Sequence, residues 1–193
     1  PGESRGHARC EEALEVAPYE QLMTDPFAEP AVLDRHGEDA GERDHEVEIV
    51  LIEPVSLLTG KVNLEDELAL QSVIAQLIRD GLATSAHDVS EGGIAVALAE
   101  CCYANLHRGP IGADVTVPSH LEILKDLFGE VSSRVLLSTD NADEVQRRTA
   151  GAGLNFHNLG KIGGNRLVLN YEGERVVDVE ISELEKAWRE GLP

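Results

Sequence analysis

The stretch from Ser85 to Glu100 constrains the fold of this chain more than any other segment. It reads Ser-Ala-His-Asp-Val-Ser-Glu-Gly-Gly-Ile-Ala-Val-Ala-Leu-Ala-Glu. A short polar strand end is followed by a serine, two glycines and an almost wholly apolar segment, which predicts a strand-to-helix turn and a helix running to about residue 104. The first turn of such a helix has unpaired backbone N–H groups and the positive end of the helix dipole, which suit an anion such as phosphate.

Two interpretations of this turn remain open. Ser90 is placed to cap the helix by accepting a hydrogen bond from the N–H of Gly92 or Gly93. Two consecutive glycines are poor helix formers, so they indicate a steric requirement: close approach of a ligand, or close packing of the helix on its neighbours. Asp88 is placed to orient His87, and His87 to donate to a phosphate or a carbonyl. The candidate substrate- or phosphate-binding residues are His87, Asp88, Ser90, Gly92 and Gly93.

Charge and cysteine content exclude several classes of partner. The 193 residues include 36 acidic and 16 basic side chains, a net charge of −20. Nucleic acids and anionic membranes both need a basic surface, so neither is an expected partner. No apolar run approaches membrane-spanning length and no secretory signal is visible. Cys10, Cys101 and Cys102 form no disulfide framework or metal spacing, so we expect Cys101 and Cys102 to pack in the core of a cytoplasmic protein.

The chain divides into two parts by composition. Residues 1–50 carry 14 acidic and four basic side chains, and prolines and glycines interrupt any periodic pattern. We therefore expect residues 1–46 to be an acidic tail that is disordered or loosely attached, and residues 47–193 to form the ordered domain. Because the chain begins with Pro1 rather than Met, we also expect a fragment or a processed piece.

Periodicity and turn residues predict a mixed order of helices and strands in the ordered part. Asn63 is expected to cap a helix that ends at Gly81. Capping boxes are expected at Ser119–Glu122 and Ser182–Glu185, the second opening a helix through Trp188. The other predicted elements are strands at 48–51, 112–117, 134–139, 155–161, 166–170 and 175–179, and a helix at 141–150. This order predicts an α+β fold, with helices packed in layers on one mixed β-sheet.

Other candidate constellations are weaker. Gly160–Gly164 is rich in glycine but leads into a strand, so a hairpin is favoured over a phosphate loop. His107, His120 and His157 have no metal-ligand spacing with acids or cysteines. Glu130 and Arg134 flank a Ser-Ser turn and are placed to pair with each other. The sequence contains no self-contained set of nucleophile, base and oxyanion donors, so no catalytic residue and no metal ligand are predicted.

Several motifs together resemble one known family. Residues 85–100 are similar to the last C-terminal domain of phosphoribosylformylglycinamidine synthase, the amidotransferase of purine biosynthesis. The segments that agree in order and spacing are 63–81, 111–115, 128–138 (Phe-Gly-Glu-Val-Ser-Ser-Arg-Val-Leu-Leu-Ser), 159–164 and 181–188. The resemblance covers approximately residues 58–193.

The resemblance implies the fold of the C-terminal domain of the aminoimidazole ribonucleotide synthetase superfamily, an α/β/α layered unit. It implies an enzyme that uses ATP, Mg²⁺ and glutamine-derived ammonia to convert formylglycinamide ribonucleotide to the amidine. It also implies two partners, an ATP-binding N-terminal-type domain and a glutaminase domain or subunit. This sequence contains neither of the two ATP-binding N-terminal-type domains that the family has, and it lacks the glutaminase cysteine. The expected role is therefore a part of the substrate cleft that is not catalytic alone and binds no cofactor alone.

Two alternatives stay open from the sequence. The chain is also compatible with the C-terminal domain of another superfamily member: selenophosphate synthetase, thiamine-monophosphate kinase or a hydrogenase-maturation enzyme. These proteins share the Gly-Gly helix start but not the His-Asp-Val-Ser context together with the Phe-Gly-Glu run. The second alternative is a stand-alone binding or assembly module without catalysis, in which the acidic tail is an interaction arm.

Overall fold

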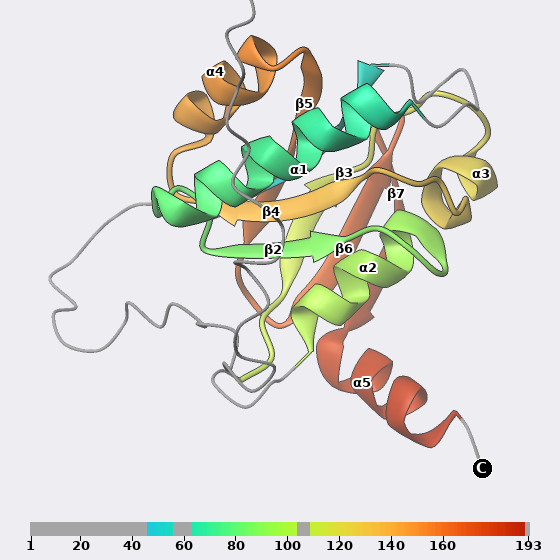
Figure 1. Ribbon diagram of the computed structural model, residues 1–193. Coiled ribbons are helices and arrows are strands. Elements are labelled where there is room, and N and C mark those ends of the chain that lie inside the picture. The colour runs from blue at the N-terminus through green and yellow to red at the C-terminus, as the bar shows by residue number, and fades with distance from the viewer. Residues whose placement is uncertain (1–45, 56–62, 104–108, 192–193) are drawn as a thin grey trace, which may run out of the picture. The chain divides into compact units, whose positions relative to one another are not determined.

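A computed structural model of the chain describes residues 46–55, 63–103 and 109–191. These residues form seven strands and five helices (Figure 1). The elements are β1 (Glu48–Pro54), α1 (Leu64–Arg79), β2 (Ser85–Asp88), α2 (Gly93–Cys102), β3 (Ala113–Thr116), α3 (Ile123–Phe128), β4 (Val135–Thr139), α4 (Ala142–Gly151), β5 (Leu154–Ile162), β6 (Arg166–Tyr171), β7 (Glu174–Glu180) and α5 (Ile181–Glu190). The predicted tail up to residue 45, and His107, lie outside the described residues.

The seven strands form one mixed sheet in the order β2-β4-β1-β5-β3-β6-β7. β1 lies inside the sheet and pairs antiparallel with both β4 and β5. Among the described strands, β3 and β6 form the one parallel pair. The sequence predicted β1 only as far as Leu51, whereas it continues to Pro54 because β5 pairs with it along its whole length.

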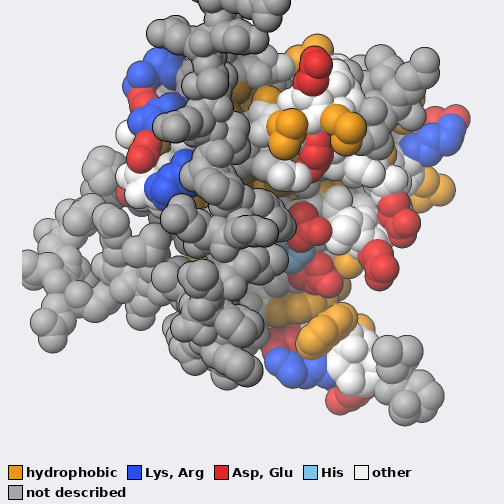
Figure 2. Space-filling view, viewed as in Figure 1, with side chains coloured by type: hydrophobic (Ala, Val, Ile, Leu, Met, Phe, Trp, Pro, Cys, Tyr) orange, Lys and Arg blue, Asp and Glu red, His pale blue; other side chains and the backbone are white. Residues whose placement is uncertain are grey.

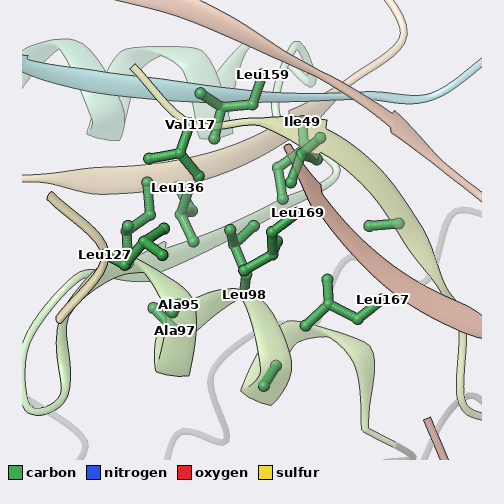
Figure 3. Close-up of a cluster of buried hydrophobic side chains, with 14 of the residues drawn as sticks. Ile49, Ala95, Ala97, Leu98, Val117, Leu127, Leu136, Leu159, Leu167 and Leu169 are labelled. Carbon is green, nitrogen blue, oxygen red and sulfur yellow. The ribbon is translucent and has the colours of Figure 1, made fainter. Parts of the chain in front are cut away.

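Helices cover both faces of the sheet. Side chains alternate across a strand, so Ile49 and Leu51 of β1 join one apolar cluster with α2, while Val50 and Ile52 join another with α1 and α4. Figure 1 shows α1 and α4 on one side of the sheet, and α2 and α5 on the other. Figure 3 shows Leu98 of α2 against Leu169 of the sheet in the first cluster. This arrangement confirms the predicted α+β fold with helices layered on a mixed sheet.

The first cluster also contains Cys102, and Cys101 packs against it, as the sequence predicted. Among the described residues, no helix combines the length and apolarity that crossing a membrane requires.

Two of the described helices begin with a side-chain cap, the one predicted at Asn63 and a further one at Asn141. The Asn63 side chain accepts a hydrogen bond from the Glu65 N–H at 3.0 Å, and Asn141 accepts one from Glu144 at 3.2 Å. Each bond satisfies one N–H that has no partner within its helix. The helices at 64–79 and 142–151 therefore begin where the sequence indicates.

The two predicted capping boxes are wrong. At α3 the N-cap is Glu122 and makes no side-chain cap bond, while Ser119 Oγ donates to Glu172 instead. The carboxylate of Asp126 accepts from the backbone N–H groups of His120 and Leu121, and so satisfies the donors that Ser119 was expected to serve. At α5 the helix already begins at Ile181, because that side chain is buried against the sheet, and Ser182 lies within the first turn.

Candidate functional site

A groove of about 770 Å³ lies beside the predicted turn. One wall is α1, which contributes apolar side chains such as Leu70, Ile74 and Ile78. The opposite wall is polar and combines the end of β2, the β2–α2 loop and the segment 130–134 that precedes β4. An apolar face opposite converging polar groups is typical of a ligand-binding site.

Two of the five predicted site residues line this groove. Asp88 and Ser90 contribute to its polar wall. His87 is held at the other side of the strand end. Its Nδ1 lies 2.7 Å from the Asp88 carbonyl oxygen, and its Nε2 lies 3.5 Å from a carboxylate oxygen of Glu100 on α2. Asp88 therefore contacts His87 through its backbone carbonyl, and the carboxylate beside the imidazole is that of Glu100.

The prediction that Ser90 caps α2 with its hydroxyl is wrong. The N-cap is Gly92, in the left-handed conformation at φ 76°, and it makes no side-chain cap bond. Because this conformation turns the chain sharply, the N–H of Gly93 donates to the backbone carbonyl of Ser90, at 3.2 Å. The Ser90 hydroxyl has no role at the cap and lies on the groove wall.

An acidic side chain occupies the start of α2. The N–H of Gly92 donates to Glu130 Oε1 at 3.2 Å. A carboxylate at this position is stabilised by the positive end of the helix dipole. The helix start is therefore paired with an anion, and that anion belongs to the protein itself.

Gly93 is required by packing. A Cβ atom at this position would lie 2.7 Å from the carbonyl carbon of Phe128 and 2.8 Å from the carbonyl oxygen of Leu127. The backbone at the end of α3 thus lies directly against the first turn of α2. Of the two readings of the Gly-Gly pair, close helix packing accounts for Gly93.

Arg134 lies between the groove and the interior. Its side chain is only 8% exposed, and its Nη2 donates to the Gly129 carbonyl oxygen at 2.8 Å. Among the described atoms, Arg134 Nε is buried and has no hydrogen-bond partner. Burial lowers the pKa of the guanidinium, and the nearby carboxylates of Glu53 and Asp126 oppose that shift. The predicted partner Glu130 is instead bound to Gly92.

A network of buried polar groups continues from Arg134. Burial favours the neutral form of Asp126, but hydrogen bonds from Leu121, Tyr171 and His120 outweigh it and hold the pKa of that carboxyl below its usual value. Glu53, which is 3% exposed, lies within 3.2 Å of His157 Nε2 and 3.9 Å of His120 Nε2. The fold therefore brings together two histidines that have no ligand spacing along the chain.

The sequence analysis missed this network, although the strand register holds a signal for it. Val135 of β4 pairs with Ile52 of β1, so Arg134 and Glu53 are the next residues along the two paired strands. His157 of β5 pairs with Leu51, two residues before Glu53 and therefore on the same face of the sheet. That register depends on strand order, which the sequence pattern does not specify.

The mixed sheet with helices on both faces, and the groove beside the Gly-Gly turn, define an α+β domain with one candidate ligand-binding groove among its described residues. Residues 53–172 match the family model "AIR synthase related protein, C-terminal domain", and the chain belongs to this family.

Within this family, the chain is homologous to the C-terminal region of phosphoribosylformylglycinamidine synthase. It is 38% identical over 134 residues to subunit PurL of Moorella thermoacetica, and 40% identical over 138 residues to subunit PurL of Alkaliphilus metalliredigens. These matches cover 68% and 69% of this chain, and 18% of each relative. The chain thus spans less than a fifth of the length of the curated relatives that it matches.

Solved structures share the fold. Thermotoga maritima PurL complexed with ATP superposes with a TM-score of 0.60 at 18% identity, over 72% of this chain and 25% of that chain. The same protein complexed with FGAR gives a TM-score of 0.61 at 18% identity, over 72% and 28%. At this identity the likeness establishes the three-layered fold.

Proposed function

We propose that this chain supplies the C-terminal domain of a phosphoribosylformylglycinamidine synthase. The complete enzyme would convert formylglycinamide ribonucleotide to the amidine with ATP and ammonia, in purine biosynthesis in the cytoplasm. The observation that carries this proposal is the 38% identity to the Moorella PurL subunit over 134 residues. The family match at residues 53–172 includes the groove. Since the match covers 18% of that subunit, the domain acts as part of a larger catalytic unit.

The groove is the proposed contribution of this domain to the substrate cleft. Asp88 and Ser90 stand on its polar wall, where a carboxylate and a hydroxyl can bind the hydroxyl groups of a ribonucleotide. In this proposal Gly92 and Gly93 hold the loop against α3, and His87 fixes the end of β2 through Glu100. The ligand thereby contacts side chains that the two glycines and His87 position.

The second wall of the cleft is proposed to come from the ATP-binding domain. The groove wall formed by α1 ends in partly exposed apolar side chains, including Ile78, and Val131 lies across from it. Figure 2 shows hydrophobic side chains at the surface over α1, with acidic side chains among them. Exposed apolar surface at a groove is typical of an interface with another domain.

ATP fits this domain alone poorly. The groove has four carboxylates, on Glu67, Asp88, Glu91 and Glu130, and one guanidinium, on Arg134. That charge balance repels a bare triphosphate, although carboxylates suit Mg²⁺. We therefore assign ATP binding mainly to the ATP-binding domain, and ammonia supply to a glutaminase domain or subunit. The structure of PurLQS from T. maritima includes a chain of this fold, which supports an assembly with further components.

A chimaeric synthase tests the proposal. The homologous region of Moorella PurL is replaced by residues 47–193 of this chain, and amidine formation is measured with ATP, ammonia and formylglycinamide ribonucleotide. We expect turnover by the chimaera and none by the isolated chain. Ser90→Ala and Asp88→Asn should each lower kcat/KM of the chimaera by about tenfold or more, the loss of one substrate hydrogen bond. Ser72→Ala, on exposed α1 surface outside the groove, is the matched control.

Each part of the proposal has its own contrary result. Turnover by the isolated chain would show that the domain is not an incomplete part of the enzyme. A chimaera that melts cooperatively but is inactive would contradict the assignment to the synthase. Unchanged kcat/KM in both groove variants would remove Asp88 and Ser90 from the substrate site.

A further inference from the structure

Glu53, His120 and His157 form a compact cluster on the α2 side of the sheet. One ligand atom from each residue lies within 4.8 Å of the other two. Both imidazoles direct Nε2 toward the same Glu53 carboxylate oxygen, His157 at 3.2 Å and His120 at 3.9 Å. The two rings stand 5.7 Å apart at 69° to each other, so they converge on one point rather than stack.

Three separate parts of the fold hold this cluster in place. Glu53 and His157 are on the paired strands β1 and β5. His120 is on the segment between β3 and α3, and its backbone N–H donates to Asp126 at 2.9 Å. Since Asp126 also accepts from Leu121 and Tyr171, the segment that bears His120 is fixed against β6. The cluster is therefore preorganised by backbone pairing and by a buried carboxylate.

Hydrogen bonding does not account for the whole arrangement. At 3.2 Å, His157 can donate to Glu53, but at 3.9 Å His120 is beyond hydrogen-bond distance from the oxygen that it faces. Ligand atoms about 2.0–2.1 Å from a tetrahedral ion lie about 3.4 Å from one another. The distances from Glu53 to the two imidazoles, 3.2 and 3.9 Å, lie on either side of this value, and all three ligand atoms lie within 4.8 Å of one another. A small movement of the two partly exposed histidines would therefore close the cluster around an ion.

Charge and access also favour a cation. Glu53 and Asp126 are buried carboxylates, and the guanidinium of Arg134 is the charge placed beside both. This leaves an excess of negative charge at the cluster. The side chains of His120 and His157 are 32% and 27% exposed, so an ion and a water molecule can reach their nitrogens while Glu53 stays buried.

We propose that Glu53, His120 and His157 bind a divalent transition-metal ion, with Zn²⁺ as the best match. Two imidazole nitrogens and one carboxylate oxygen suit Zn²⁺, Co²⁺ or Ni²⁺, whereas Mg²⁺ prefers oxygen ligands alone. With three protein ligands, the fourth position is left for water. The ion would tie the segment before α3 to the two central strands. The sequence predicted no metal ligand, because these residues come together only in the folded sheet.

Metal titration of the full chain tests this site. The metal-free protein is titrated with Co²⁺, followed by visible absorption, and with Zn²⁺, followed by calorimetry. We expect one equivalent at this site with the intense absorption of tetrahedral Co²⁺, and a rise in Tm of about 5 °C or more when Zn²⁺ is at 100 times its Kd. Mg²⁺ should give neither signal.

Variants assign the bound ion to the cluster. His120→Gln and His157→Gln should each lower the affinity for that one metal ion by at least about tenfold and abolish the rise in Tm. His87→Gln is the matched control, a partly exposed histidine beside a carboxylate but outside the cluster. Because the chain has seven histidines and three cysteines, the variants distinguish this site from other metal binding.

Two results would overturn the site. The first is the lack of any tetrahedral Co²⁺ signal in the full chain. The second is that both cluster variants keep the Co²⁺ signal and the Zn²⁺ affinity of the parent, while the metal-free variants melt at the same Tm as the metal-free parent. Neither result affects the synthase proposal, since the chimaera assay depends on Asp88 and Ser90.

Discussion

At the scale of single residues, the Gly-Gly pair shows how one motif can serve packing and a binding site together. Gly92 and Gly93 both have positive φ, at 76° and 69°. Gly93 also lies against the backbone of Phe128, at a distance that admits no side chain. The glycines let α2 begin directly against α3, and this placement leaves Ser90 and Asp88 on the groove wall.

We predict that Gly93→Ala destabilises the domain by about 3 kcal/mol, from a strained positive φ together with overpacking against α3. The free energy of unfolding from urea denaturation measures the effect. Gly151→Ala is the matched control, because a Cβ atom there meets nothing within 4 Å and its φ is not in the left-handed region. Equal stability of the two variants would show that the contact with Phe128 relaxes without cost.

At the scale of elements, the β6–β7 hairpin concentrates ion pairs on one carboxylate. Arg166 Nε donates to Asp178 Oδ1 at 2.6 Å, and Arg175 Nη1 donates to Asp178 Oδ2 at 2.9 Å. The hydrogen bond from Arg166 lowers the pKa of Asp178 below its ordinary 3.8; desolvation opposes this shift, and the hydrogen bond from Arg175 adds to it. Asp178 therefore favours the folded state in its ionised form.

This pairing predicts an acid-dependent loss of stability. A carboxyl whose pKa is lower in the folded protein stabilises it above the unfolded pKa, and that contribution is lost as the pH falls through the folded pKa. The parent should thus be more stable than Asp178→Asn at pH 7, and the difference should begin to shrink below about pH 4 and disappear as the pH falls through the lowered pKa of Asp178. Urea denaturation at pH 7 and at several lower pH values measures the difference. A difference that stays constant from pH 7 to about pH 2 would contradict the linkage to Asp178.

The elements themselves were largely predictable, because each depends on local pattern. The helix after Asn63 and the strands of the C-terminal hairpin follow directly from periodicity and turn residues. The sequence predicted the wrong starting residues for α2, α3 and α5, because contacts from distant residues determine where these three helices begin. Glu130 pairs with Gly92, Asp126 satisfies the N–H groups before α3, and burial of Ile181 extends α5 by one residue. No local pattern contains these contacts.

At the scale of the whole molecule, the described surface includes apolar side chains that no other described element covers. Leu64 and Leu68 of α1 are 74% and 66% exposed. In the proposed synthase these residues would face another domain. We predict that Leu64→Glu with Leu68→Glu changes the stability of this chain by no more than about 0.5 kcal/mol, while it lowers activity of the chimaera.

Thermal melts of the isolated chain and the chimaera assay check the two halves of this prediction. Lys186→Glu, on α5, is a control substitution that changes charge away from α1. A chimaera with the parent's activity after both leucine substitutions would show that this face of α1 is not an interface.

The candidate site could be predicted from the sequence only in part, because contacts between residues far apart in the chain form most of it. Asp88 and Ser90 belong to one contiguous motif, so the sequence could nominate them. Arg134, Glu53, His120 and His157 are distributed over four separate segments, which strand order and the hydrogen bonds to Asp126 bring together. A contiguous motif identifies one wall of a site, whereas residues contributed by several strands appear only with the fold.

The central position of β1 determines how the chain reaches this fold. β1 pairs with β4 and with β5, and Glu48 of β1 is paired with Lys161 of β5, which lies more than a hundred residues later in the chain. Closing such a long loop is slow, since its entropy is lost before the pairing stabilises it. On the ribosome, β1 emerges long before either neighbour. It stays without a strand partner until β4 has been made, and without its second partner until β5 follows. The sheet is therefore completed from its middle only late in synthesis, and Ile49–Ile52 is the segment that a chaperone would need to shield.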